Sequence, residues 1–146
     1  MLRMLLWLIV IVVVAGMAYV RLAPSDPAQW NTRAEPVGTG TRTRPNGYIW
    51  RDEIEGDATA KLQALADVAE AAPRTSLLAG SVQEQQLTFV TRSAFFGFPD
   101  YTTMGIYQTA EGETYLEVYG RARFGSSDLG VNTQRIKRWL GSVEGG

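Results

Sequence analysis

The chain has 146 residues, with 14 Lys and Arg against 15 Asp and Glu, a net charge of −1, and neither Cys nor His. This charge balance argues against a nucleic-acid-binding protein, which normally carries a basic excess. Without Cys and His there is no disulfide framework, no ordinary zinc site and no Cys–His or Ser–His–Asp catalytic group. We therefore expect a non-enzymatic protein with no catalytic residues, no metal and no cofactor.

The first predicted element is a hydrophobic helix over residues 1–22. Residues 4–20 carry no charge, and Arg3 and Arg21 flank them. This run spans ~25 Å as a helix, and snorkelling arginines extend its reach toward the ~30 Å of a bilayer core. The alternative is a cleavable signal peptide, with Gly-Met-Ala at residues 16–18 as the cleavage site. The weak basic region before the run favours an uncleaved, single-pass transmembrane anchor.

The composition also bears on the compartment. Lys61 and Lys137 are the only lysines among the basic residues, and this Arg bias, together with frequent Ala and Gly, indicates a GC-rich bacterial genome. Positive charges nearly balance across the helix, and a short N-terminal tail is easily left in the cytoplasm. We expect a bacterial inner-membrane protein whose domain faces the periplasm.

Residues 23–46 are predicted to form a Pro/Gly-rich linker. Four prolines and two glycines interrupt it, at positions 24, 27, 36 and 45 and at 38 and 40. Trp30 is unusual in such a segment. Either it packs on the edge of the domain, or it enters the lipid headgroup region.

Residues 47–146 are predicted to form one α+β domain. The expected strands cover residues 47–53, 75–81, 85–92, 101–109 and 114–123, and the expected helices cover 58–72 and 131–142. In the third of these strands, Leu87 and Phe89 alternate with Thr88 and Val90, as in a sheet covered on one side. The pattern predicts a small twisted antiparallel sheet of about five strands with two helices packed on one face.

A motif precedes the last helix, in the segment RFGSSDLGVNTQR. It resembles the domain-of-unknown-function 1499 family of bacterial and chloroplast proteins, which has a pattern close to S-R-x-G-x-x-D-x-G-x-N-x-x-R there. The matching residues are Arg123, Gly125, Asp128, Gly130, Asn132 and Arg135. Ala122 replaces the first Ser, only Asp100 matches an upstream pair of Asp, and Pro45-Asn46-Gly47 lacks the Cys of the family. The resemblance covers about residues 46–143. It implies an often membrane-associated domain without an established activity.

This loop has three interpretations. In the most common outcome for such residues, Asp128 caps the helix and pairs with Arg123 or Arg135, in a structural network that also includes Asp100 and Asn132. Alternatively, the loop binds an anion at the helix N-terminus. The candidate anion-binding residues are Arg121, Arg123, Ser126, Ser127 and Arg135. In the third interpretation, Asp100 or Asp128 does acid–base work.

Phe95, Phe96 and Phe98 form a second candidate site, in a turn-rich loop. Such rings most often fold under the edge of a sheet. Otherwise they form an exposed patch that contacts a membrane or a protein.

Together these features predict a non-enzymatic, membrane-tethered module, an accessory or scaffold subunit that docks on a larger bacterial inner-membrane complex. Its expected partners are the membrane and a protein, and no nucleic acid. The first alternative is a binding domain for an anionic small molecule or lipid headgroup at the loop before the last helix. The second is a carboxylate-dependent hydrolase.

Overall fold

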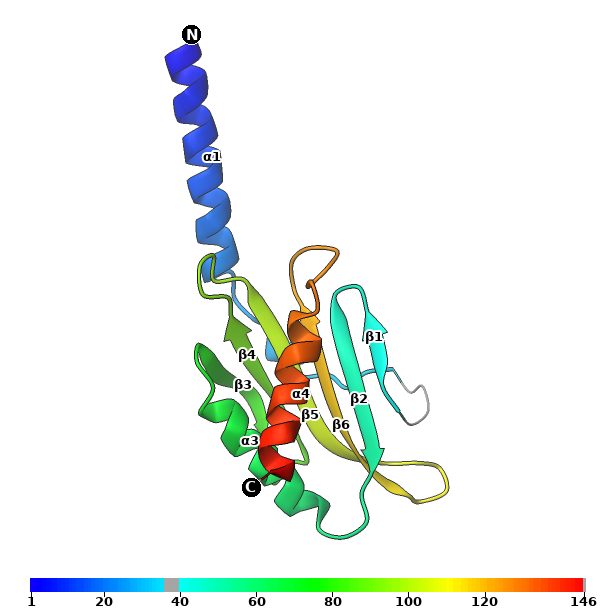
Figure 1. Cartoon of the computed structure of the whole chain (residues 1–146). Coiled ribbons are helices and arrows are strands. Elements are labelled where there is room, and N and C mark those ends of the chain that lie inside the picture. The colour runs from blue at the N-terminus through cyan, green and yellow to red at the C-terminus, as the bar shows by residue number, and fades with distance from the viewer. Residues whose placement is uncertain (36–39, 146) are drawn as a thin grey trace.

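The computed structural model describes residues 1–35 and 40–145 (Figure 1). Two parts of the chain lie outside the described residues. They are residues 36–39, within the expected linker, and residue 146, at the end of the expected domain. The helices are α1 (Leu2–Leu22), α2 (Pro27–Trp30), α3 (Ala58–Glu70) and α4 (Val131–Glu144). The strands are β1 (Arg42–Arg44), β2 (Gly47–Glu53), β3 (Thr75–Ser81), β4 (Gln86–Arg92), β5 (Pro99–Gln108) and β6 (Thr114–Ala122).

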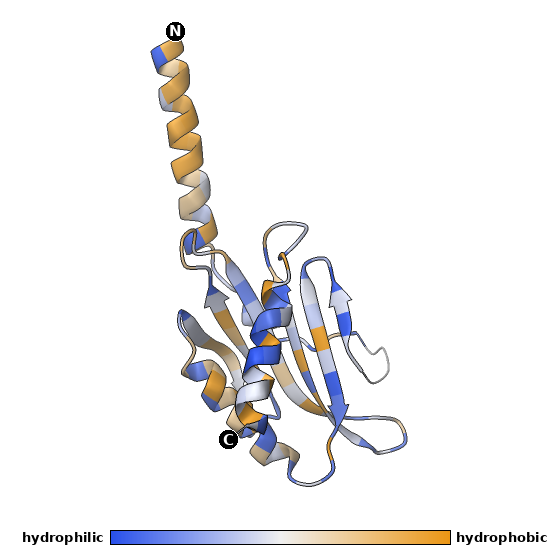
Figure 2. Cartoon of the chain, viewed as in Figure 1, coloured by the Kyte–Doolittle hydropathy of each residue, from blue (hydrophilic) through white to orange (hydrophobic). Residues whose placement is uncertain are grey.

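Helix α1 projects from one end of the domain as a straight rod (Figure 1). None of its residues is buried, and hydrophobic residues occupy most of its length (Figure 2). A helix that is apolar all round is stable only when something apolar surrounds it. By length and composition α1 is able to cross a membrane, although an N-terminal signal sequence meets the same criterion.

The domain contains one open antiparallel sheet with the strand order β1-β2-β6-β5-β4-β3. The α+β class is therefore confirmed, but the sheet has six strands and not five. The additional strand is β1, which lies within the expected linker and pairs with β2 in the register Arg42↔Ile49 to Arg44↔Gly47. Its sequence, Arg-Thr-Arg, has no apolar alternation, because an edge strand is held by backbone hydrogen bonds and needs no buried side chains.

Helices α3 and α4 pack on the same face of the sheet, as predicted. Asp57 caps α3 by accepting a hydrogen bond from the Ala60 amide at 2.9 Å. The apolar stripes of both helices meet the inward-facing side chains of β4, β5 and β6 in a single core. Its fully enclosed members include Leu62, Leu65, Phe89, Met104, Leu116, Val118 and Ile136.

A segment of the expected linker covers the opposite face of the sheet. We call residues 24–35 the clamp segment. Trp30 stacks on Tyr101 of β5 with ring centroids 4.1 Å apart and an interplanar angle of 14°. Next to it, Asn31 accepts hydrogen bonds from Gln86 at 2.7 Å and Thr88 at 2.9 Å, both in β4. Trp30 therefore packs on the sheet face. The polar side chains that alternate along the strands contact the clamp segment, which forms a second layer on this face.

A buried ion pair joins the clamp segment to the middle of the sheet. Arg51 of β2 donates a hydrogen bond to Glu117 of β6, and the two side chains are only 3% and 1% exposed. Glu117 also accepts from the Ala34 amide at 2.8 Å, while Arg51 donates to the Glu35 carbonyl at 3.0 Å. A buried charge is tolerated when it is paired and hydrogen-bonded in this way. Sequence reasoning missed this pair, because both residues occupy positions that alternation alone assigns to solvent.

Candidate functional site

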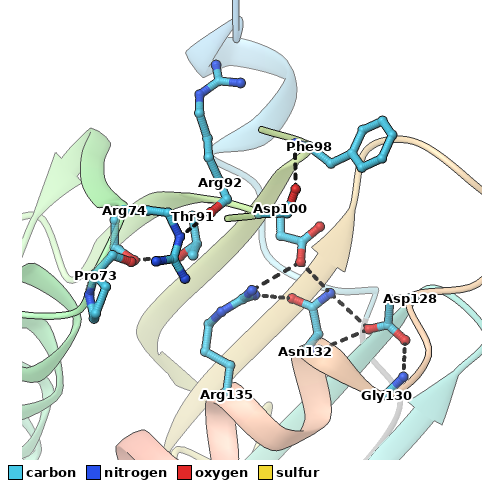
Figure 3. Close-up of polar contacts among 12 residues, drawn as sticks. Pro73, Arg74, Thr91, Arg92, Phe98, Asp100, Asp128, Gly130, Asn132 and Arg135 are labelled. Atoms are coloured by element: carbon cyan, nitrogen blue, oxygen red, sulfur yellow. Dashed lines mark hydrogen bonds and ion pairs between the residues drawn. The ribbon is translucent and has the colours of Figure 1, made fainter. Parts of the chain in front are cut away.

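Most of the predicted site residues lie at the end of the domain from which α1 emerges, which we call the α1 end (Figure 1). Four polar residues meet there in one network (Figure 3). Asp100, at the start of β5, accepts a hydrogen bond from Arg135 at 3.2 Å and from the Asn132 side-chain amide at 3.4 Å. Arg135 also donates to Asn132 at 2.8 Å. The network ties the first turn of α4 to the sheet.

Asp128 organises the start of α4. Its carboxylate accepts from the backbone amides of Gly130 at 2.9 Å and Asn132 at 3.1 Å, and from the Asn132 side chain at 2.9 Å. The residue at the N-cap position is Gly130 itself, with φ +77° and no side chain to cap the helix. Asp128 supplies the missing acceptor from two residues upstream. The loop must also hold Leu129 at φ +53°, a conformation that a branched side chain rarely adopts.

The network borders an apolar cleft of about 370 Å³ between the loop before α4 and the loop before β5. Phe98, Phe124 and Leu129 line it, and Asp100 and Asp128 lie at its border. Burial raises the pKa of Asp100 above its usual value, and Arg135 only partly offsets this effect.

The structure does not bring the three predicted arginines together. Arg121 lies in β6 and Arg123 directly follows its end, and both side chains contact the clamp segment, whereas Arg135 belongs to α4 on the other face of the sheet. Arg121 is buried. It donates to Thr103 at 2.7 Å and to the Trp30 carbonyl, and its guanidinium lies 4.5 Å from the Tyr119 ring centre.

Arg123 and the two serines complete the predicted set. Arg123 donates to the Pro24 carbonyl at 2.9 Å and to the Tyr101 hydroxyl at 3.3 Å. Ser126 and Ser127 lie exposed in the loop before α4, and Ser127 accepts a hydrogen bond from the Leu129 amide at 3.2 Å. These serines therefore lie on the loop, away from the buried Arg121.

Arg121 and Arg123 instead border a polar cleft of about 420 Å³ beside the clamp segment. Arg33 and Arg44 also line this cleft, and Glu35 is the one acidic residue among its lining residues. Burial lowers the pKa of Arg121 to about 10. Sequence reasoning missed Arg33 and Arg44, because only the docking of the clamp segment and the pairing of β1 bring them beside β6.

The phenylalanine loop is exposed. The exposed fractions of Phe95, Phe96 and Phe98 are 82%, 47% and 41%. The loop lies against the last turn of α1, where a Cβ atom added to Gly97 would come within 2.9 Å of the Arg21 side chain. The three rings are therefore exposed, and their contact with a membrane or a protein stays a prediction.

Among residues 1–35 and 40–145, no group of three or more acidic side chains is placed to hold a metal ion. Asp100 and Asp128 line the apolar cleft, and both accept hydrogen bonds within the network.

The fold and site define a class of protein: a small α+β domain, with two helices on one face of its sheet and a clamp segment on the other, carried behind an apolar N-terminal helix. The chain belongs to the family described as Protein of unknown function (DUF1499), which matches residues 20–143. The matched region includes the clamp segment and β1 as well as the predicted domain, and it confirms the resemblance seen in the sequence. No curated protein matches the chain.

Proposed function

We propose that this protein is a non-enzymatic, single-pass module of the bacterial inner membrane, which presents its domain in a fixed orientation to a larger membrane complex. The observation that carries the proposal is the connection between α1 and the domain. Only Ala23 separates α1 from the clamp segment, and Ala23 is buried. The clamp segment is in turn bonded to four strands of the sheet.

These contacts distinguish the protein from a domain on a flexible tether. Ser25 is hydrogen-bonded to Tyr101 at 2.6 Å, directly after the helix, and Arg123 holds the Pro24 carbonyl. A flexible linker would only raise the local concentration of the domain near membrane partners. A short, fixed connection also fixes which surface faces those partners, as an accessory or scaffold subunit requires.

The available chemistry supports a non-enzymatic role. The chain has no His and no Cys, and the carboxylates of Asp100 and Asp128 accept hydrogen bonds from Arg135, Asn132 and backbone amides. We place the domain on the periplasmic side, because the short N-terminal tail is easily retained in the cytoplasm.

Membranes washed with carbonate, followed by crosslinking and native mass spectrometry in mild detergent, test the proposal. The expected result is an intact chain in the washed membranes and a reproducible larger assembly. A chain that always runs alone, or one whose mature N-terminus lies near Tyr19, would contradict it.

A second candidate function, binding of an anionic small molecule or lipid headgroup, rests on the arginines that line the polar cleft. Arg33, Arg44, Arg121 and Arg123 line this cleft, and a guanidinium suits phosphate and carboxylate groups. Arg44→Ala and Arg123→Ala should each weaken binding of inorganic phosphate or a phospholipid headgroup. Arg138→Ala, an exposed position on α4 outside the cleft, is the matched control. Equal binding by all three variants would remove this candidate.

A further inference from the structure

The aromatic side chains at the α1 end form one continuous row. It starts at Tyr19 in α1 and continues through Phe124, Phe98 and Phe96 to Phe95. Successive ring centroids are 6.2, 6.4, 5.6 and 5.5 Å apart. We call these five residues the aromatic row. It joins three segments that are distant in sequence: α1, the loop before β5 and the loop before α4.

The exposed part of this row is apolar and large. Phe95, Phe96 and Phe98 are all exposed, and Leu129, at the end of the neighbouring loop before α4, is 88% exposed. Leu129 is also held at a positive φ, so the loop keeps a bulky apolar side chain in a strained conformation that points into solvent. Exposed apolar patches of this kind mark interaction surfaces.

Basic side chains accompany the row. Arg21 lies against Gly97, Arg92 donates to the Gly97 carbonyl at 2.9 Å, and the Arg123 guanidinium lies 5.1 Å from the Phe124 ring centre. Aromatic rings flanked by arginines match the interface of a bilayer, where rings occupy the headgroup level and guanidinium groups bind lipid phosphates.

The position of the row beside the last turn of α1 indicates that the row contacts the bilayer. The apolar run of α1 continues to Val20, and Tyr19 and Arg21 belong to its last turn. These two residues contact Phe124 and the phenylalanine loop respectively. A helix that crosses the membrane up to Val20 places both of these loops at the headgroup level, because they lie beside its last turn.

We infer that the aromatic row and Leu129 insert into the headgroup interface of an anionic bilayer, so that the α1 end of the domain lies flat on the membrane. This inference rests on the proposed function, since it requires α1 to remain in the membrane. It adds a second attachment to the anchor, which prevents the domain from rotating about α1.

The absence of native Cys allows a direct test in the full-length protein. Ala94→Cys, next to Phe95 and exposed, accepts an NBD fluorophore without removing any ring of the row. Glu111→Cys, exposed in the β5–β6 turn at the opposite end of the domain, is the matched control (Figure 1). Each labelled protein is placed in nanodiscs of phosphatidylethanolamine and phosphatidylglycerol. There, spin-labelled lipids quench fluorophores in the bilayer, and iodide quenches those in water.

The expected result is quenching by lipid and protection from iodide at position 94, and the reverse at position 111. The double substitution Phe95→Ser and Phe96→Ser in the Ala94→Cys protein should abolish the quenching by lipid. Because both rings are exposed, this variant should keep the melting temperature of its parent, which confirms that it folds.

Two results would overturn the inference: equal iodide access at positions 94 and 111, or unchanged lipid quenching after the double substitution. If the chain in these samples is intact and carbonate-resistant, such a result removes the inserted row and leaves the proposed function standing. A mature chain that begins near Tyr19 removes both.

Discussion

The ion pair between Arg51 and Glu117 offers the sharpest test of how the clamp segment is held. Glu117→Gln removes the negative charge but keeps the shape of the side chain and an oxygen that accepts from the Ala34 amide. The Arg51 guanidinium then stays buried without its counter-charge. Since the two side chains are 3% and 1% exposed, solvent cannot compensate for the lost charge interaction. Breaking one partner of a buried pair costs about 3–5 kcal/mol.

This loss should be visible as a large fall in melting temperature. For a domain of this size, a change of 1 kcal/mol shifts the melting temperature by about 3–5 °C. Glu117→Gln should therefore lower it by about 9–25 °C. The measurement is thermal unfolding of the full-length protein in mild detergent, followed by tryptophan fluorescence, to which Trp30 of the clamp segment contributes together with three other tryptophans.

Two further variants complete this test. Glu111→Gln, in the exposed turn, should change the stability by less than about 0.5 kcal/mol. Adding Arg51→Met to Glu117→Gln should restore part of the loss, since no uncompensated charge then remains in the interior. If Glu117→Gln unfolds within a few degrees of Glu111→Gln, the assignment of the clamp contact to this ion pair is wrong.

Three more predictions concern the two faces of the sheet. Trp30→Ala removes the stack on Tyr101. Because Trp30 is only half-buried, the free energy of unfolding should fall by the lower end of the ~3–5 kcal/mol typical of Trp→Ala in a core. A loss below about 1 kcal/mol in thermal unfolding would contradict this packing. Asp128→Ala should destabilise the protein by about 1 kcal/mol, because the first turn of α4 loses its acceptor, and Asp128→Asn by clearly less; equal losses would show that capping is not the role of Asp128. Burial raises the pKa of Asp100 above 3.8, so its stabilising contribution is complete below that pH and is lost as the pH rises through the folded-state pKa. The stability of the wild type relative to Asp100→Asn should therefore fall as the pH rises above about 4, and a difference independent of pH in unfolding experiments would refute the shift.

The helices and the central strands could be predicted because their signals are local. The apolar stripe of α3, ending near Ala69, and the alternation of Leu87 and Phe89 in β4 are visible within a few neighbouring residues. The span of α1 follows from composition alone. The capping role of Asp128 was also accessible, since a cap contacts the helix that begins next to it.

The candidate site was only partly predictable. A network of Asp128, Asp100 and Asn132 with either Arg123 or Arg135 was predicted, and the structure shows that Arg135 is the arginine and that it pairs with Asp100, 35 residues away. Here the family motif supplied the information, and periodicity did not. The expected convergence of Arg121 with Arg135 did not occur, because their elements present them to opposite faces of the sheet.

The amino-acid sequence by itself determined the anchor-like helix, the two helical stripes and the alternating strands, because each follows from the order of polar and apolar residues along a short stretch. Only the tertiary structure decided that Arg42–Arg44 completes the sheet and that residues 24–35 cover its second face. It also decided that Arg51 pairs with Glu117 across 66 residues. These contacts depend on the path of the whole chain. Their energy comes from burial and pairing between distant segments, which leaves no periodic trace in either segment.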